Sequence, residues 1–337
     1  MMKLYCCPNC FNDSFLQSEI DVRSTKKGKC SFCQTNNISI LEPEELKNLF
    51  EPVLDIYEKN EKGKSLFKLF QEDWLIFSQI LNDDNLSKLL YKISGIDTNE
   101  SYSPIYQEER RNIEQWEAFR EELKHNNRFF PNNAPSIEMI RPFGKYLGKK
   151  LQKGNFLFRA RVNPDDTPIN IAEMGKPPKK KSTNGRANPI GIPYLYVASS
   201  PETAIAEIRG NKGEKLSIAK FVISEDLELA DLRNPRITVT PFGLDDDELE
   251  LIFTNLPFLE LLGNELSKPI VPREANLEYL PSQYLSEIIK HVGFHGIIYK
   301  SSVSNGDNYV LFDDSKVQAV DVVQYEIIDI ITKSEKI

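Results

Sequence analysis

The pattern of apolar and polar positions changes character near Gly154. Beyond this point, short apolar and aromatic runs of strand length recur at 156–162, 194–198, 216–224, 227–232, 296–300, 308–313 and 317–328. The segments between them carry apolar residues at helical spacing, which predicts helices at 201–210, 245–263 and 281–292. Strands and helices therefore interleave, and we expect a mixed α+β domain over residues 151–330.

The preceding stretch, residues 41–150, is typical of helices. Apolar residues recur at helical spacing within 46–57, 66–77, 85–93, 105–125 and 137–151. Pro52 should kink or shorten the first of these helices. The Asn- and Pro-rich segment 126–136 is typical of a connector. We expect an all-α domain here.

All five cysteines lie within the first 33 residues. Two CxxC pairs, Cys7/Cys10 and Cys30/Cys33, are separated by 19 residues, and two such turns can close a tetrahedral shell of four thiolates around Zn²⁺. The spacing resembles a zinc ribbon, expected over residues 1–40, with the metal structural because a filled shell leaves no position for substrate. Cys6 lies beside this set, and a pairing of Cys6 with Cys10 remains an alternative.

Composition and charge narrow the classes of partner. The formal net charge of −8 disfavours a general affinity for nucleic acid, whose phosphates reward surplus Lys and Arg. The sequence has no apolar run of about 18 residues and no leader of signal-peptide type, so we expect a cytoplasmic protein without a membrane partner. The basic cluster at 176–182 is either a solvated loop or a mobile lid that attracts anions. No Gly-rich phosphate loop follows a strand, which disfavours Rossmann and P-loop folds.

Three residues within 184–208 carry groups suited to cutting a nicotinamide–ribose bond: Arg186, Tyr196 and Glu207. A guanidinium can clamp a pyrophosphate, and an aromatic ring can stack on nicotinamide. A carboxylate can stabilise positive charge growing at the ribose C1′. Residue types alone make this a weak signal, because function must be argued from a site.

The segment GRANPIGIPYLYVASSPETAIAEI resembles the core of the RES domain, in which an Arg loop is followed by a Tyr and then a Glu at the intervals seen here. LFRARV (157–162) resembles the opening strand of that family, with Arg159 at its first Arg, and 282–312 resembles its closing block, with Ser301 and Asn308 at polar positions. Two departures are Ala187, where an aromatic residue is common, and Lys300, where Pro is usual.

This resemblance implies an ADP-ribosyltransferase-like fold and an NAD⁺ glycohydrolase that releases nicotinamide and ADP-ribose, acting as an NAD⁺-depleting toxin or an anti-phage effector. Glu207 would be the catalytic carboxylate, Arg186 and Tyr196 would bind and stack NAD⁺, and the flanking positions Arg159, Ser301 and Asn308 would complete the site. Arg161 and Ser302 are alternatives to Arg159 and Ser301. An ADP-ribosyltransferase with a macromolecular acceptor is the alternative activity.

The helical stretch has a weaker resemblance to HEPN domains, because Arg120 and His125 fit their Arg-x4-His pattern. This resemblance implies a ribonuclease, and the alternative is a solvated helix end with His125 near its C-terminal dipole. A separate hypothesis is that the zinc ribbon and the helical domain form a sensing or binding module that controls the RES domain. An antitoxin or an activating trigger is the expected macromolecular partner. The sequence leaves the oligomeric state open.

Overall fold

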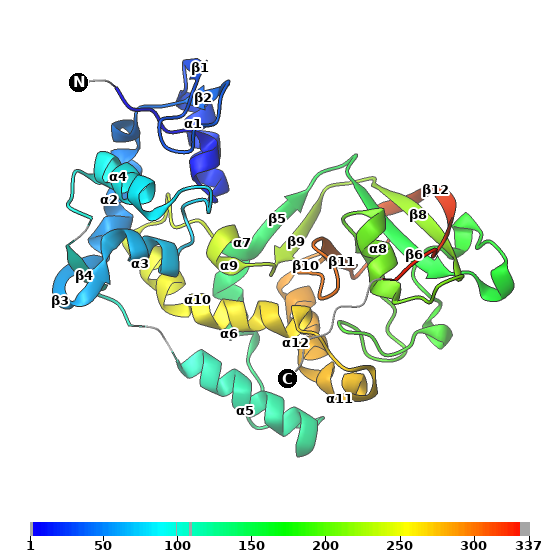
Figure 1. Ribbon diagram of the computed structural model, residues 1–337. Coiled ribbons are helices and arrows are strands. Elements are labelled where there is room, and N and C mark those ends of the chain that lie inside the picture. Colours follow the sequence, from blue (N-terminus) through cyan, green and yellow to red (C-terminus); the bar gives the residue numbers. More distant parts are fainter. Residues whose placement is uncertain (1–2, 99, 108–109, 331–337) are drawn as a thin grey trace. The chain divides into compact units, whose positions relative to one another are not determined.

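The computed structural model describes residues 3–98, 100–107 and 110–330, and its contacts divide the chain into two compact units (Figure 1). Unit 1 comprises Met1–Arg111 and Asn234–Glu260, and unit 2 comprises Asn112–Arg233 and Leu261–Ile337. The two units thus interleave along the chain, whereas the sequence alone predicts consecutive domains that meet near residues 40 and 150. The three-domain division stays a prediction.

Unit 1 consists of short helices and two two-stranded sheets, β1–β2 and β3–β4. Its elements are η1 (Pro8–Cys10), α1 (Ser14–Arg23), β1 (Lys26–Gly28), β2 (Ile38–Ile40), η2 (Pro43–Leu46), α2 (Lys47–Asp55), β3 (Tyr57–Ser65), α3 (Leu66–Asp73), α4 (Asp83–Ser94), β4 (Ser101–Pro104), α9 (Pro235–Thr238) and the first part of α10 (Asp246–Ser267).

Helices α2, α3 and α4 lie where the apolar spacing predicts them, and α2 is short, with Pro52 inside it. The prediction of a purely helical stretch is wrong at β3 and β4, which pair antiparallel. Strand β3 has the sequence YEKNEKGKS, so it lacks the alternating apolar residues that would reveal a half-buried strand.

The core of unit 1 is aromatic and includes residues from both of its chain segments. Phe50 packs against Phe70 and against Phe242, with ring centroids 6.0 and 4.9 Å apart. Trp74 packs against Phe253 at 5.7 Å. Residues 234–260 therefore belong to this core, although they interrupt the sequence of unit 2.

Unit 2 is built on one eight-stranded sheet of order β12-β8-β6-β7-β11-β10-β9-β5. Its strands are β5 (Gly148–Leu151), β6 (Phe156–Val162), β7 (Leu195–Ala198), β8 (Lys215–Ile223), β9 (Leu227–Asp231), β10 (Gly296–Lys300), β11 (Asp307–Leu311) and β12 (Val317–Glu326). Its helices of more than three residues are α5 (Arg111–His125), α6 (Ile137–Ile140), α7 (Gly144–Leu147), α8 (Pro201–Ile208), the end of α10, α11 (Ala275–Glu278) and α12 (Leu280–Val292). Neighbouring strands are antiparallel except for the parallel pair β9 and β10.

The expected α+β fold of the C-terminal region is confirmed, and all seven strands predicted there are present. The edge strand β5 was not predicted, because its sequence GKKL has no apolar alternation. The helix expected over residues 137–151 is wrong in part, since the chain forms α6, a 3-10 turn, α7 and then β5. In the described part of the chain, no helix combines the length and apolar character needed to cross a membrane.

The two faces of the sheet in unit 2 bury different clusters. One face packs a large apolar core that includes Leu157, Val197 and Ala219. The other face packs Ala160, Ala198 and Ile218 against Ala204 of α8. Because successive side chains of a strand point to opposite faces, Phe158 and Ala160 lie on the α8 side and Arg159 on the other.

Candidate active site

A cavity of about 280 Å³ opens beside α8, at the point where β6 and β7 separate. The two strands pair only at Phe158 and Ala198, so the sheet splits on either side of this contact. The lining residues come from β6, β7, α8, β10 and β11: Phe158, Arg159, Ala160, Tyr196, Val197, Ala198, Ala204, Glu207, Ile208, Tyr299 and Asn308. Residues from five separate chain segments thus meet in one hollow, with the polar side chains of Glu207 and Asn308 among them.

Glu207 lies in the last turn of α8, whose N-terminus is capped by the Ser200 side chain. Its Oε1 accepts a hydrogen bond from Ser301 Oγ and another from Asn308 Nδ2, each 2.6 Å long. Two donors on one oxygen fix the orientation of the carboxylate. Oε2 takes no part in these two bonds.

The loop between β10 and β11 brings Ser301, rather than Ser302, to the carboxylate. The Ser301 hydroxyl also accepts from the backbone N–H groups of Val303 and Ser304, at 3.1 and 3.0 Å, so its direction is set. Farther along this loop, Gly306 lies so close to Thr203 of α8 that a Cβ would overlap the Thr203 hydroxyl. A glycine is therefore required for the loop to reach α8.

Tyr196 lines the cavity, and its hydroxyl lies against the loop that carries Arg186. The hydroxyl donates to Asn188 Oδ1 at 2.7 Å and accepts from Ala187 N at 2.9 Å. Burial raises the pKa of Tyr196 above its ordinary value, so the hydroxyl remains a donor at neutral pH.

The loop around Arg186 is fastened to α12. Gln283 Nε2 donates to the carbonyl oxygens of Gly185 and Asn188, at 2.8 and 3.1 Å, and Ser282 Oγ donates to the Arg186 carbonyl at 2.6 Å. Helix α12 therefore supports the site by holding this loop. The sequence alone shows only that the helix is amphipathic and contains a Gln. The rigidity of the loop follows from these hydrogen bonds.

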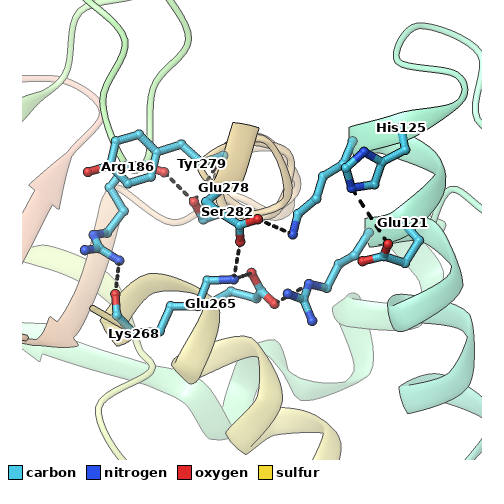
Figure 2. A network of polar contacts seen from close by, with 10 residues as sticks. Glu121, His125, Arg186, Glu265, Lys268, Glu278, Tyr279 and Ser282 are labelled. Carbon is cyan, nitrogen blue, oxygen red and sulfur yellow. Dashed lines mark hydrogen bonds and ion pairs between the residues drawn. The ribbon is translucent and has the colours of Figure 1, made fainter. Parts of the chain in front are cut away.

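The Arg186 side chain leaves this loop toward the segment after α10. Its Nη1 donates to the Lys268 carbonyl at 2.8 Å, and its guanidinium lies 5.5 Å from the ring centre of Tyr279 (Figure 2). Arg186 is not among the described residues that line the cavity, so it lies next to the hollow that holds Glu207 rather than inside it.

Arg159 lines the cavity, but its guanidinium binds elsewhere. Nη1 donates to the carbonyls of Met174 and Gly175, while Arg161 Nη1 donates to the Glu173 carbonyl at 2.7 Å. Burial, followed by repulsion from Arg161, lowers the pKa of Arg159 to about 10, so it stays charged at neutral pH. Both arginines thus hold the segment 173–175.

Two residues of the site had no sequence signal. Tyr299 lines the cavity, but within GIIYK it is indistinguishable from any buried strand residue. Asn188 is buried and bonds Tyr196, but it lies in a loop rich in Asn and Pro, where an Asn is expected for turn formation.

Four of the five cysteines converge in unit 1. The Sγ atoms of Cys7, Cys10, Cys30 and Cys33 all lie within 4.8 Å of one another. Zn–S bonds of about 2.3 Å in a tetrahedron place sulfurs about 3.8 Å apart, so this set fits a thiolate metal site. Cys6 is outside the set, and its Sγ lies 3.5 Å from the Leu41 carbonyl.

The Arg-x4-His pair does not converge on a common site. Arg120 Nε lies 2.8 Å from Glu265 Oε1, whereas His125 Nε2 lies 3.9 Å from Glu121 Oε2 on an exposed part of α5. Each member of the pair thus faces its own carboxylate.

Comparison with known proteins gives three findings. No curated protein matches the chain. Among solved structures, a chain of the crystal structure of the M. tuberculosis MbcT-MbcA toxin-antitoxin complex is similar, with 13% identity, a TM-score of 0.34, and coverage of 56% of this chain and 92% of that chain. The profile of the RES domain family matches residues 157–331, which is more than half of the 337 residues. This protein therefore belongs to the RES domain family.

Proposed function

We propose that the cavity beside α8 binds the nicotinamide–ribose end of NAD⁺ and that the protein hydrolyses the bond between them. The observation that carries this proposal is the placement of Glu207, a carboxylate oriented by Ser301 and Asn308 at the wall of a cavity in a RES domain. Aromatic groups of Tyr196 and Tyr299 line the same cavity and supply faces for a planar ring.

The size of the cavity indicates how the dinucleotide would lie. At about 280 Å³ it is slightly smaller than the roughly 300–1,000 Å³ of typical ligand pockets, so it suits one half of NAD⁺. The pyrophosphate would then lie outside, within reach of the Arg186 guanidinium, which is suited to bind it in a bidentate fashion. The Arg159 guanidinium bonds the segment 173–175 on the other face of the sheet, so we assign it no contact with NAD⁺ here.

The reaction breaks the C1′–N bond, and its electron pair leaves with nicotinamide. The ribose then carries positive charge at C1′, which the Glu207 carboxylate stabilises. Water attacks C1′ and loses a proton, which gives ADP-ribose. In a transferase, a macromolecular nucleophile would replace this water, and every other role would be unchanged.

The remaining parts of the chain fit supporting roles. The four thiolates of unit 1 would hold a structural Zn²⁺, which would cross-link the two CxxC segments and take no part in the reaction. An enzyme that depletes NAD⁺ would act as a toxin or a defence effector, held in check by an antitoxin or awaiting a trigger. The separate surroundings of Arg120 and His125 do not favour a ribonuclease.

The decisive experiment measures nicotinamide release from NAD⁺ by the full chain and by Glu207→Gln. This change keeps the shape of the side chain but removes its charge, so turnover should fall by at least about 100-fold with little change in NAD⁺ binding. Glu202→Gln, on the same helix but outside the cavity lining, is the matched control.

Absence of nicotinamide release by the full chain would refute the proposal. Full activity of Glu207→Gln would refute the assignment of the carboxylate. Nicotinamide release with ADP-ribose attached covalently to a macromolecule would select the transferase.

A further inference from the structure

Helix α5 precedes the region matched by the RES family, yet it is part of unit 2. Its Phe119 ring lies 4.6 Å from the ring of Tyr284 on α12, and Trp116 is fully buried. Helix α12 also supplies the groups that fasten the Arg186 loop. Helix α5 therefore contacts the helix that supports that loop.

A chain of charged groups joins α5 to the surroundings of Arg186 (Figure 2). Lys124 Nζ donates to Glu278 Oε1 at 2.6 Å, and Lys268 Nζ donates to Glu278 Oε2 at 3.2 Å. The Lys124 side chain is only 5% exposed. Glu278 thus uses one oxygen for α5 and the other for Lys268.

Lys268 and the residue that follows Glu278 also contact the Arg186 side chain. Lys268 provides the carbonyl that accepts from Arg186 Nη1, and Tyr279, the residue after Glu278, provides the ring beside the guanidinium. Within the described residues the guanidinium donates one hydrogen bond, and a guanidinium has five N–H donors. It is thus held at one edge, with donors left for an anion.

Charge accounts for the stability of this arrangement. Burial alone would raise the pKa of Glu278, but hydrogen bonds from Lys124 and Lys268 outweigh it and hold the pKa below its ordinary value. Glu265 forms two further ion pairs, 2.8 Å from Arg120 Nε and 3.2 Å from Lys268 Nζ. Among the described residues, neither Arg120 Nε nor Glu265 Oε2 has a hydrogen-bond partner, so these pairs connect α5 to Lys268 less firmly than Glu278 does. Glu278 is therefore the main connection between Lys124 and Lys268.

We propose that Lys124 and Glu278 are positioning residues for the NAD⁺ site, which hold the Lys268 carbonyl and the Tyr279 ring so that Arg186 is presented to the pyrophosphate. This role rests on the proposed function of the cavity. It also gives α5 a structural role in unit 2, in place of the ribonuclease role that its Arg-x4-His pattern suggests.

The first test separates binding from turnover. Lys124→Met keeps most of the buried stem but removes the charge, so KM for NAD⁺ should rise about 5- to 10-fold, while kcat stays within about twofold. Lys124→Arg keeps the charge and should restore most of the affinity. Lys150→Met is the matched control, because Lys150 pairs with Asp226 in an exposed ion pair of the same unit.

The second test is a double-mutant cycle. If Lys124 acts through Arg186, then Lys124→Met should change KM little further once Arg186→Ala has removed the guanidinium. An equal rise of KM in both backgrounds would overturn the proposal. So would a loss of kcat at unchanged KM, or a loss of activity that only matches a loss of folded protein.

The third test does not depend on catalysis. Hydrogen exchange of the backbone amides at residues 184–188 should be faster in Lys124→Met than in wild type or in Lys150→Met, because the loop loses part of its support. Unchanged exchange overturns the positioning role. If wild type releases no nicotinamide but exchange responds as expected, the NAD⁺ function fails and the positioning of Arg186 stands.

Discussion

The hydroxyl of Tyr196 donates a 2.7 Å hydrogen bond to Asn188 Oδ1, and this bond ties strand β7 to the loop that carries Arg186. The same tyrosine lines the cavity that holds Glu207. Ring and loop therefore cannot move independently. A residue expected only to stack on a substrate also positions the residue expected to bind its pyrophosphate.

Tyr196→Phe should destabilise the protein, because it leaves the buried Asn188 oxygen and the Ala187 N–H without their partner. We expect a loss of about 1–3 kcal/mol in the free energy of unfolding, measured by urea denaturation. Tyr325→Phe, at an exposed position of β12, is the control. A loss no larger than that of the control would contradict the role of the hydroxyl.

Gly306→Ala should weaken the site through its loop. The new methyl group would overlap the Thr203 hydroxyl and come within 2.9 Å of Ser199 Oγ, so the loop must move away from α8. We expect a cost of about 1–3 kcal/mol and a lower rate of nicotinamide release, since Ser301 lies on the same loop. Gly144→Ala, whose Cβ would make an ordinary 3.5 Å contact with Val292, should be nearly neutral in both assays.

Removal of a bound metal should unfold the N-terminal region. We expect about one zinc per chain by elemental analysis, retained in Cys6→Ser and lost in Cys33→Ser, because Cys6 lies outside the four-thiol set. A chelator should lower the melting temperature of wild type and leave that of Cys33→Ser unchanged. Protein prepared without chelator that contains no zinc would be evidence against the site.

Acid should weaken the connector after α5 through Glu122. Backbone N–H groups of Asn132 and Asn133 lower the pKa of this carboxyl below its ordinary value. Its contribution to stability is therefore complete above the unfolded pKa of about 4.3 and is lost as the pH falls through the folded pKa.

Glu122→Gln should accordingly be less stable than wild type at neutral pH, and the difference should shrink as the pH falls below about 4. Urea midpoints measured across this range test the sign. Glu121→Gln, at the exposed neighbouring position, should show no such convergence. A difference that widens in acid would show that the carboxylate is not held in its charged form.

The sequence predicted those parts of the fold that depend on local pattern. The strand FLFRARV and helix α8 were found because apolar periodicity is local. Strand β3 was missed because it is almost wholly polar, and the division into units was missed because the packing of Phe242 on Phe50 joins residues far apart in sequence.

In the candidate site, too, contacts between residues far apart in sequence could not be predicted. Glu207, Ser301 and Asn308 were singled out by resemblance, and the structure brings Ser301 and Asn308 each within hydrogen-bond distance of Glu207. No sequence pattern could show that the Arg159 guanidinium binds the carbonyls of Met174 and Gly175. The link from Lys124 to Glu278 spans 154 positions and has no local signature.

The interleaved units have a consequence for how this protein can be divided. The chain passes between units after Arg111, after Arg233 and again after Glu260, within the continuous helix α10. A single cut between residues 105 and 111 would leave both units joined through the other two passages. A gene fragment that begins at residue 151 would still encode Phe242 and Phe253, now without the aromatic partners from residues 1–111. Because each unit contains two separate chain segments, no single cut of the chain releases either unit whole.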